Sequence, residues 1–346
     1  MRSCAASRSW TVLALMAFAS IALAQTGNSD ATKRQFLRKV IQLDDEKVAA
    51  MERGEVVTKQ LPSPEKPEIA AFGAVRVHAT LDKLREQIRA FQEFRKVPQI
   101  VQIGRFASPP RIEDIEGLTI EDNDLKALEA CRPGKCDVKV APAGLDRLKK
   151  EINWSLPDAK AKASALLKEQ MLAYVKAYLA GGTDAMAVLV DKSQAKELSA
   201  EFRTLLGHSP YLVEYVAPFD AYLESYPRGH LAGAEDVIFW TKDTFGLKPV
   251  VSVYHGTVYK QEEPRPLLLI AIKTLYASHY FNAALELMAA VPAPNGSGID
   301  LLDLYRVRID PPTGMLSGVL MGKVKSGIEE GVAMNLRNAK ARLEQR

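Results

Sequence analysis

Apolar residues recur along this chain at two different spacings, which together predict a mixture of helices and strands. A spacing of about three to four residues is typical of helices, and strict alternation with polar residues is typical of half-buried strands. The segment 108–140 is acidic and rich in turn-forming residues. In the part of the chain before it, the patterns predict helices over 30–53 and 80–94 and strands over 56–61, 69–79 and 99–106.

The middle of the chain, residues 141–232, is predicted to be helical. Its last helix presents an apolar face that includes Leu212, Val216 and Phe219. Pro218 lies within this helix and should kink it, because proline lacks the N–H that the helix needs. We expect these helices to form an insertion or a lid.

Strand patterns return in the last third of the chain, over 250–260 and 305–309. The segment 267–291 has two possible interpretations, a buried helix or strands. Its alanines and leucines suit a buried helix, whereas aromatic residues such as Tyr276 and Tyr280 suit strands.

The chain ends in a long amphipathic helix, predicted over 315–345 from apolar residues at helical spacing. Deletion from Val324 onward should prevent folding if this helix belongs to the core. Glycine recurs along its amino-terminal half from Gly314 to Gly331. Each interior glycine costs about 1 kcal/mol against alanine, so we expect close approach to a sheet or a bend there.

The order of these elements resembles the START-type, or polyketide-cyclase-like (SRPBCC), helix-grip superfamily. The matching pieces are Gly54-Glu55-Val56-Val57, the strand 69–79, the helix 80–94 and the terminal helix. The resemblance implies an α+β fold in which a curved antiparallel sheet grips a long C-terminal helix, here with a helical insertion. It also implies an apolar cavity between sheet and helix for a lipid or another hydrophobic molecule. No residue motif accompanies it, so no functional residue is carried over.

We divide the chain into four parts on these grounds. They are a signal peptide (1–24), an N-terminal α+β part with a cysteine loop (25–140), the helical insertion or lid (141–232), and the strands with the terminal helix (233–346).

The first of these parts predicts export. Arg2 and Arg8 precede an apolar run from Trp10 to Leu23, and Ala22 and Ala24 form an A-x-A cleavage pattern. The run is too short for a stable membrane span. A Sec-type signal peptide would place the mature protein in the periplasm or outside the cell, with no transmembrane segment after cleavage.

Composition limits the class of protein. The chain has 346 residues, of which 47% are hydrophobic and 25% charged, values that exclude a disordered or collagen-like chain. The formal net charge is only +4. Dedicated nucleic-acid binders carry a stronger basic excess, so we expect no nucleic-acid partner.

Two cysteines, Cys131 and Cys136, flank a Pro-Gly turn in the mature chain. Such a turn can bring the two side chains together, and an exported protein meets oxidising surroundings. We therefore predict a disulfide that pins one turn.

Known catalytic motifs are mostly absent from the sequence. There is no G-x-S-x-G, P-loop, H-E-x-x-H, G-x-G-x-x-G or EF-hand pattern, and the five histidines lack metal-ligand spacing. We expect no metal and no cofactor, and whether the protein is an enzyme stays open, with the balance against it.

The candidate binding residues come from an aromatic and histidine-rich cluster near 235–280. We expect at least three of them to line one enclosed space beneath the terminal helix, as a mostly apolar pocket with few polar groups would require. The alternative is an aromatic core with hydrogen-bonded histidines. The five candidates are Trp240, Tyr254, His255, Tyr276 and His279.

Three functions follow as hypotheses. The first is an exported protein that binds a hydrophobic small molecule or lipid in this cavity. The second is a hydrolase or cyclase-like enzyme that uses His255 or His279 with a nearby acid. The third is a structural or interaction module that uses the tyrosine-bearing helices 157–226.

Overall fold

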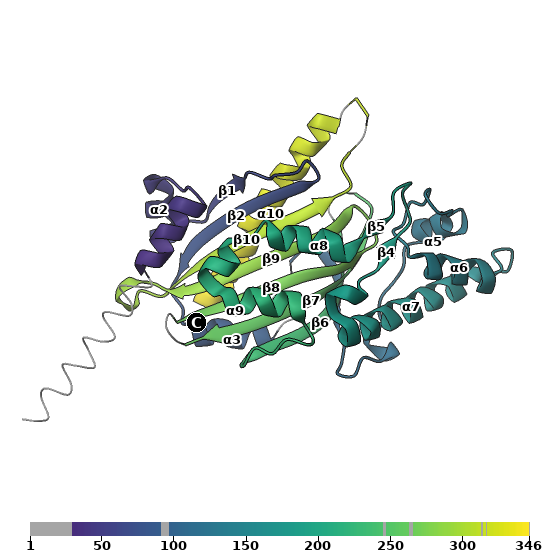
Figure 1. Cartoon of the computed structure of the whole chain (residues 1–346), viewed down its shortest axis with the longest axis horizontal. Coiled ribbons are helices and arrows are strands. Elements are labelled where there is room, and N and C mark those ends of the chain that lie inside the picture. Colours follow the sequence, from purple (N-terminus) through teal and green to yellow (C-terminus); the bar gives the residue numbers. More distant parts are fainter. Residues whose placement is uncertain are drawn as a thin grey trace, which may run out of the picture.

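The computed structural model describes residues 30–90, 97–244, 247–262, 266–312, 314–315 and 317–345, so the predicted signal peptide lies outside the described residues. Eight strands form one antiparallel sheet in the order β1-β2-β10-β9-β8-β7-β6-β3 (Figure 1). Their bounds are Val57–Leu61 (β1), Glu68–Val77 (β2), Ile100–Arg105 (β3), Ala234–Asp243 (β6), Val250–Gln261 (β7), Leu267–Ala277 (β8), Phe281–Pro292 (β9) and Ile299–Ile309 (β10). The short strands Val188–Leu189 (β4) and Lys196–Glu197 (β5) pair separately.

Helices cover both faces of this sheet. Figure 1 shows α8 and α9 lying across one face, with α5, α6 and α7 grouped at one end of the strands. The terminal helix α10 contacts β2, β1 and β10. The helices are Asp45–Glu52 (α2), Leu81–Arg89 (α3), Asp122–Glu129 (α5), Pro142–Glu151 (α6), Ala159–Gly181 (α7), Leu198–Gly207 (α8), Tyr211–Ser225 (α9) and Ser317–Glu344 (α10), with a π-helical turn at Phe36–Val40 (η1).

This architecture confirms the predicted fold class. The protein is α+β, with a large antiparallel sheet, a long C-terminal helix and helices between β3 and β6. The predicted helix over 30–53 is interrupted, since Gln42 has a positive φ of 58° between η1 and α2. The predicted strand over 69–79 corresponds to β2, and the predicted helix over 80–94 begins as α3.

The open segment 267–291 forms two strands, β8 and β9, which pair with each other. Tyr280, at φ 58°, lies in the turn between them. Residues on both sides of β8 are buried, because helices cover both faces of the sheet: Leu269 belongs to the core on one face, and Leu268 and Ile270 to the core on the other. A strand buried on both faces has no alternation, which is why its sequence also suits a buried helix.

The terminal helix packs tightly on the sheet through its C-terminal half. Leu336 and Val332 are buried against β2 and β10. A Cβ atom added to Gly73 on β2 would lie 2.6 Å from a methyl carbon of each of these two side chains, so glycine permits the close approach. The close approach expected at the helix's own glycines is wrong. Nothing described lies within 4 Å of a Cβ added to Gly318 or Gly322, and Figure 1 shows that end of α10 projecting past the sheet.

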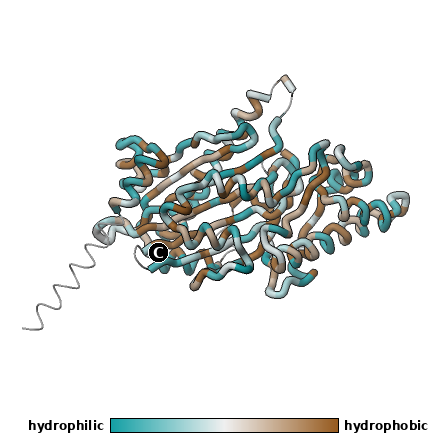
Figure 2. The backbone as a smooth tube through the Cα atoms, viewed as in Figure 1, coloured by the Kyte–Doolittle hydropathy of each residue, from teal (hydrophilic) through white to brown (hydrophobic). Residues whose placement is uncertain are grey.

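The opposite face of the sheet carries the larger apolar core. It joins η1 and α2 to α7, α8 and α9 over the central strands. Figure 2 shows hydrophobic stretches along the strands beneath these helices and hydrophilic ones along the outer turns. The helical middle of the chain therefore contributes core to this face.

The predicted disulfide is confirmed: Cys131 and Cys136 are bonded to each other. The turn between them docks against the segment before β5, because the Gly134 N–H donates to the Val190 carbonyl at 2.7 Å. The Cys136 N–H donates to the Asp191 carbonyl at 2.9 Å. Gly134 has a φ of 79°, a conformation that favours glycine in this turn.

In the part of the chain that the structure describes, no helix combines the length and the apolar character that a membrane crossing requires.

Candidate ligand cavities

Strand β7 sends two of the five candidate residues to opposite faces of the sheet. Tyr254 stacks on Phe239 in the core of the α10 face, with ring centroids 4.9 Å apart. His255, the next residue, contacts Tyr178 of α7 on the other face. Neighbouring residues on a strand point in opposite directions, so these two cannot line one space together.

The polar atoms of three other candidates hold loop segments against the sheet. The Trp240 indole N–H donates to the Asp114 carbonyl at 2.9 Å, and the Tyr276 hydroxyl donates to the Lys139 carbonyl at 2.7 Å. His279 Nδ1 lies 2.9 Å from the Asp137 carbonyl oxygen. These side chains attach the segment 106–140 to the sheet, which agrees with the hydrogen-bonded core of the alternative interpretation.

His255 forms the centre of a buried hydrogen-bond chain. Its Nδ1 lies 2.8 Å from the Tyr178 hydroxyl, and its Nε2 lies 2.9 Å from Asp236 Oδ1. Burial raises the pKa of Tyr178 well above its ordinary value, so the phenol keeps its proton and donates it to Nδ1. Nε2–H then donates to the Asp236 carboxylate.

Burial lowers the pKa of His255 despite its bond to Asp236, which favours the neutral ring. Burial alone would raise the pKa of Asp236, but hydrogen bonds from His255 and Tyr222 outweigh it and the pKa is lowered. Each imidazole nitrogen is therefore committed to a protein partner. A general base needs a nitrogen within reach of the substrate proton, so this geometry does not favour an enzyme acting through His255.

An apolar cavity lies between α9 and the sheet, on the face opposite α10. We call it the α9 cavity; its volume is about 120 Å³. Strands β2, β8, β9 and β10 form its floor, and α9 and η1 form its walls. Side chains that line it include Phe36, Phe72, Leu212, Val216, Leu287, Ala289 and Leu304.

A break in α9 shapes one wall of the cavity. Val216 has non-helical angles of φ −148° and ψ 48°, two residues before Pro218. The kink predicted from Pro218 is therefore present, and Leu212, Tyr215 and Val216 on its amino-terminal side all line the cavity.

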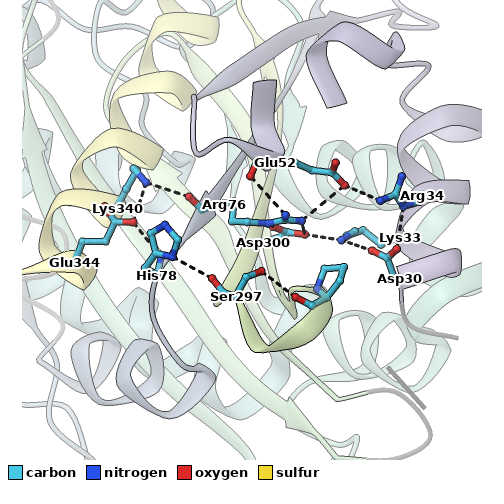
Figure 3. Close-up of polar contacts among 11 residues, drawn as sticks. Asp30, Lys33, Arg34, Glu52, Arg76, His78, Ser297, Asp300, Lys340 and Glu344 are labelled. Carbon is cyan, nitrogen blue, oxygen red and sulfur yellow. Dashed lines mark hydrogen bonds and ion pairs between the residues drawn. The ribbon is translucent and has the colours of Figure 1, made fainter. Parts of the chain in front are cut away.

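A charged network fixes the segment that forms the opposite wall. Lys33, which lines the α9 cavity, donates to Asp300 Oδ2 at 2.5 Å, and Arg76 donates to the other oxygen of Asp300 at 2.7 Å (Figure 3). Asp30 Oδ1 forms an ion pair with the Lys33 ammonium at 2.6 Å. Asp300 is fully buried, so these pairs replace the water that its carboxylate loses on folding.

The pKa values of this network reflect its pairing. A hydrogen bond from Arg76 to Asp300 is the main cause that raises the pKa of Arg76, against the opposing effect of burial. Burial would raise the pKa of Asp30, but hydrogen bonds from Lys33 and Arg34 outweigh it and the pKa is lowered. Arg76 and Asp30 are therefore charged near neutral pH, and the ion pairs around them hold the wall that carries Lys33 and Phe36 in place.

A second cavity, of about 160 Å³, lies between α3 and strands β6, β7 and β8. We call it the α3 cavity. Its floor is apolar and includes Ile88, Val258 and Ile272, and its rim carries charged residues that include Arg85, Arg105 and Glu235.

Neither of these two cavities is the one predicted beneath the terminal helix, and that cavity stays a prediction. No residue of α10 lines either of these two cavities, because α10 packs directly on β2 at Gly73. None of the five candidate residues lines them either. A direct role of these five in ligand binding stays a prediction.

Sequence reasoning missed the residues that line the α9 cavity. Phe36, Phe72 and Leu304 are far apart in the sequence and belong to three different elements. The apolar face of α9 was the one available signal in the sequence, because Leu212 and Val216 indicate a helix face that packs against another element. Among the described residues, no group of three or more His, Cys, Asp or Glu side chains is arranged to hold a metal ion.

Comparisons with known proteins add little to this geometry. No family model matches the chain, and no curated protein matches it. Among solved structures, the chain is similar to a fragment (25–204) of a STAR-related lipid transfer protein from Xanthomonas axonopodis, with 10% identity and a TM-score of 0.36. The match covers 84% of this chain and 94% of that one. A similarity this low carries no argument about function.

The fold and the site together define a class: an α+β protein whose antiparallel sheet has a long terminal helix on one face and an apolar cavity under a helical segment on the other.

Proposed function

We propose that this protein binds a hydrophobic small molecule, or the hydrocarbon part of a lipid, in the α9 cavity. The observation that carries the proposal is the lining of this cavity, in which aliphatic and aromatic side chains predominate and Lys33 is already paired with two carboxylates. Apolar surface that a ligand covers is removed from water, which contributes about 25 cal/mol for each Å².

The size of the cavity limits what fits inside. An engineered protein cavity of about 150 Å³ holds benzene, so about 120 Å³ accommodates a small ring or a short run of methylene groups. A longer chain would extend through the open side of the cavity. Charged head groups are not favoured inside, because the buried charges at this wall already neutralise one another.

Fluorobenzene is a suitable probe, followed by 19F NMR titration of the purified protein. We expect saturable line broadening in the parent protein. Ala289→Phe places a ring inside the cavity and should weaken binding at least about tenfold, the equivalent of 1.4 kcal/mol. Ala221→Phe, on the exposed side of α9, is the matched control and should bind as the parent does. Equal binding by parent and Ala289→Phe would contradict the proposal.

We also propose that residues 1–24 direct export and are removed. The support is the basic start, the apolar run and the A-x-A pattern, and a disulfide is favoured in an oxidising compartment. The intact mass of the protein from fractionated cells tests this. A mature chain that begins at Gln25 in the exported fraction is expected, and an uncleaved chain in the cytosolic fraction would contradict it.

A further inference from the structure

The α3 cavity differs from the α9 cavity in the charges around it. Three arginines, Arg85, Arg89 and Arg105, line it together with two acids, Glu235 and Asp236. Each arginine carries a planar fork of donors that matches the oxygens of a carboxylate or phosphate. The chemistry of a ligand for this cavity depends on which arginine donors are left unused by the carboxylates around them.

The two acids are already committed. Asp236 accepts from Tyr222, His255 and Thr257, a set of donors from α9 and β7. Glu235 accepts from Arg85 and, at 2.8 Å, from Arg89. The hydrogen bond from Arg89 is the main cause that lowers the pKa of Glu235 to about 2, with Arg85 adding to it against the effect of burial.

Donors on the arginines remain unused. The Nε of Arg85 is buried and has no hydrogen-bond acceptor among the described residues. Arg105 is exposed at the rim, and within the same part of the chain it forms no ion pair or side-chain hydrogen bond. A buried donor without an acceptor is unfavourable, so a ligand oxygen at Arg85 would recover part of this cost.

The floor beneath these donors is apolar. Ile88 from α3 and Ile270 and Ile272 from β8 are each 8% exposed, and Gly256 on β7 adds only backbone atoms to this lining. A group that reaches the arginines from the floor must therefore be attached to a hydrocarbon chain. Neither the unused arginine donors nor the apolar floor specifies the ligand alone. Together they favour a ligand that is acidic at one end and apolar at the other.

We propose that the α3 cavity is a second ligand site, which binds an amphiphile with a carboxylate or phosphate head group. The acidic group lies at Arg85 and Arg105, and the hydrocarbon part lies on Ile88, Ile270 and Ile272. Glu235 acts as an internal competitor, since it occupies donors of Arg85 and Arg89 that the ligand head group could use. This site lies on the other face of the sheet from the α9 cavity and does not depend on it, although Ile270 of β8 lines both cavities.

Isothermal titration calorimetry with octanoate, octyl phosphate, octanol and inorganic phosphate tests the chemistry. In the Ala289→Phe protein, whose α9 cavity is filled, we expect octanoate and octyl phosphate to bind and octanol to bind at least about tenfold more weakly, as the loss of a charge-assisted hydrogen bond implies. Equal binding of octanol would overturn the acidic requirement. Binding of inorganic phosphate as tight as that of octyl phosphate would overturn the amphiphile, because the site would then recognise a free anion.

Two substitutions of opposite sign test the location. Arg105→Met should weaken octanoate binding about tenfold and leave octanol unchanged, whereas Lys149→Met, an exposed charge on α6, should change neither. Glu235→Gln should tighten octanoate binding severalfold, because it frees the arginine donors. A general loss of structure would weaken binding in both variants. Weaker binding in Glu235→Gln, or no change in Arg105→Met, would overturn the site.

The Ala289→Phe variant separates this proposal from the one for the α9 cavity. Octanoate binding should persist in that variant even though fluorobenzene binding is lost. If octanoate binding disappears as well, the octanoate lies in the α9 cavity and the second site is wrong.

Discussion

The two cavities lie on opposite faces of one sheet and have opposite chemistry. The α9 cavity has charges only at its wall, where Lys33 and Asp300 neutralise each other. The α3 cavity has an apolar floor and three arginines, one of which has no carboxylate partner among the described residues. The paired charges hold a wall of the α9 cavity in place, whereas the unpaired arginine of the α3 cavity is available to bind an acidic ligand. Whether charges are paired, more than whether they are present, therefore decides what each face can bind.

The largest expected effect comes from Asp300→Ala, at the wall of the α9 cavity. This change leaves the buried Lys33 ammonium and the Arg76 guanidinium without their central partner, which should cost about 3–5 kcal/mol of stability. Urea unfolding measures the loss. In protein that remains folded, fluorobenzene binding should weaken while octanoate binding persists. An unchanged free energy of unfolding would show that the network does not hold this wall.

On the other face, Leu336→Ala tests the packing of α10. Leu336 is fully buried between α10 and β2, and its truncation should cost about 2–5 kcal/mol. Urea unfolding again gives the value, and Leu320→Ala on the exposed part of α10 is the control, with little expected change. Binding in the α9 cavity should survive in the folded Leu336→Ala protein. A cost no larger than that of the control would show α10 to be an appendage.

Lys273 gives the α9 face a pH-dependent stability. Its ammonium lies 3.8 Å from the Phe202 ring centroid and donates to the Thr183 hydroxyl, and burial lowers its pKa to about 7. The unfolded chain holds this proton up to an ordinary pKa of 10.5. Because the unfolded state binds more protons between these two values, stability should rise with pH from about 7 to about 10.5.

Lys273→Met should remove that rise and stabilise the protein at pH 7 by about 1–4 kcal/mol, the range seen when buried ionic groups give way to apolar ones. Thermal unfolding of parent and variant at pH 7 and pH 10 provides the comparison. A parallel pH dependence in the two proteins would show that Lys273 does not carry the effect.

The smallest effect should come from the disulfide, which lies apart from both cavities. It closes a loop of only a few residues, so replacing Cys131 and Cys136 together by serine should cost at most about 2 kcal/mol. Binding of both probes should be unchanged. Loss of either binding activity would show that the cysteine loop positions a cavity wall. Thiol labelling of denatured, unreduced parent protein should detect essentially no free cysteine.

Part of the fold could be predicted from polar residues that interrupt buried strands, as in β2, the neighbour of the edge strand β1. Arg76 lies between the buried residues Val75 and Val77, and that pattern places β2 within one residue of the predicted start. The hairpin of β8 and β9 could not be predicted, because residues on both of its faces are buried. The strand β6 was also missed, since its acidic start at Glu235 and Asp236 suits a surface turn as well.

The candidate site was harder to predict for a different reason. The sequence showed that Trp240, His255 and Tyr276 were unusual, but it did not show which segments would receive their polar atoms. Asp114, Tyr178 and Lys139 come from distant parts of the chain. The α9 cavity depends on the small size of Ala289 and on a break in α9, and no sequence motif indicates a cavity of this kind.

Crystals soaked in 1-iodobutane test the central claim most directly, because iodine is located by its anomalous scattering. We expect an iodine peak inside the α9 cavity, in contact with Ala289 and Leu212, and no such peak in crystals of the Ala289→Phe variant. Iodine found at other sites while the α9 cavity stays empty, or side chains that fill the cavity, would contradict the claim that this protein binds a hydrophobic molecule there.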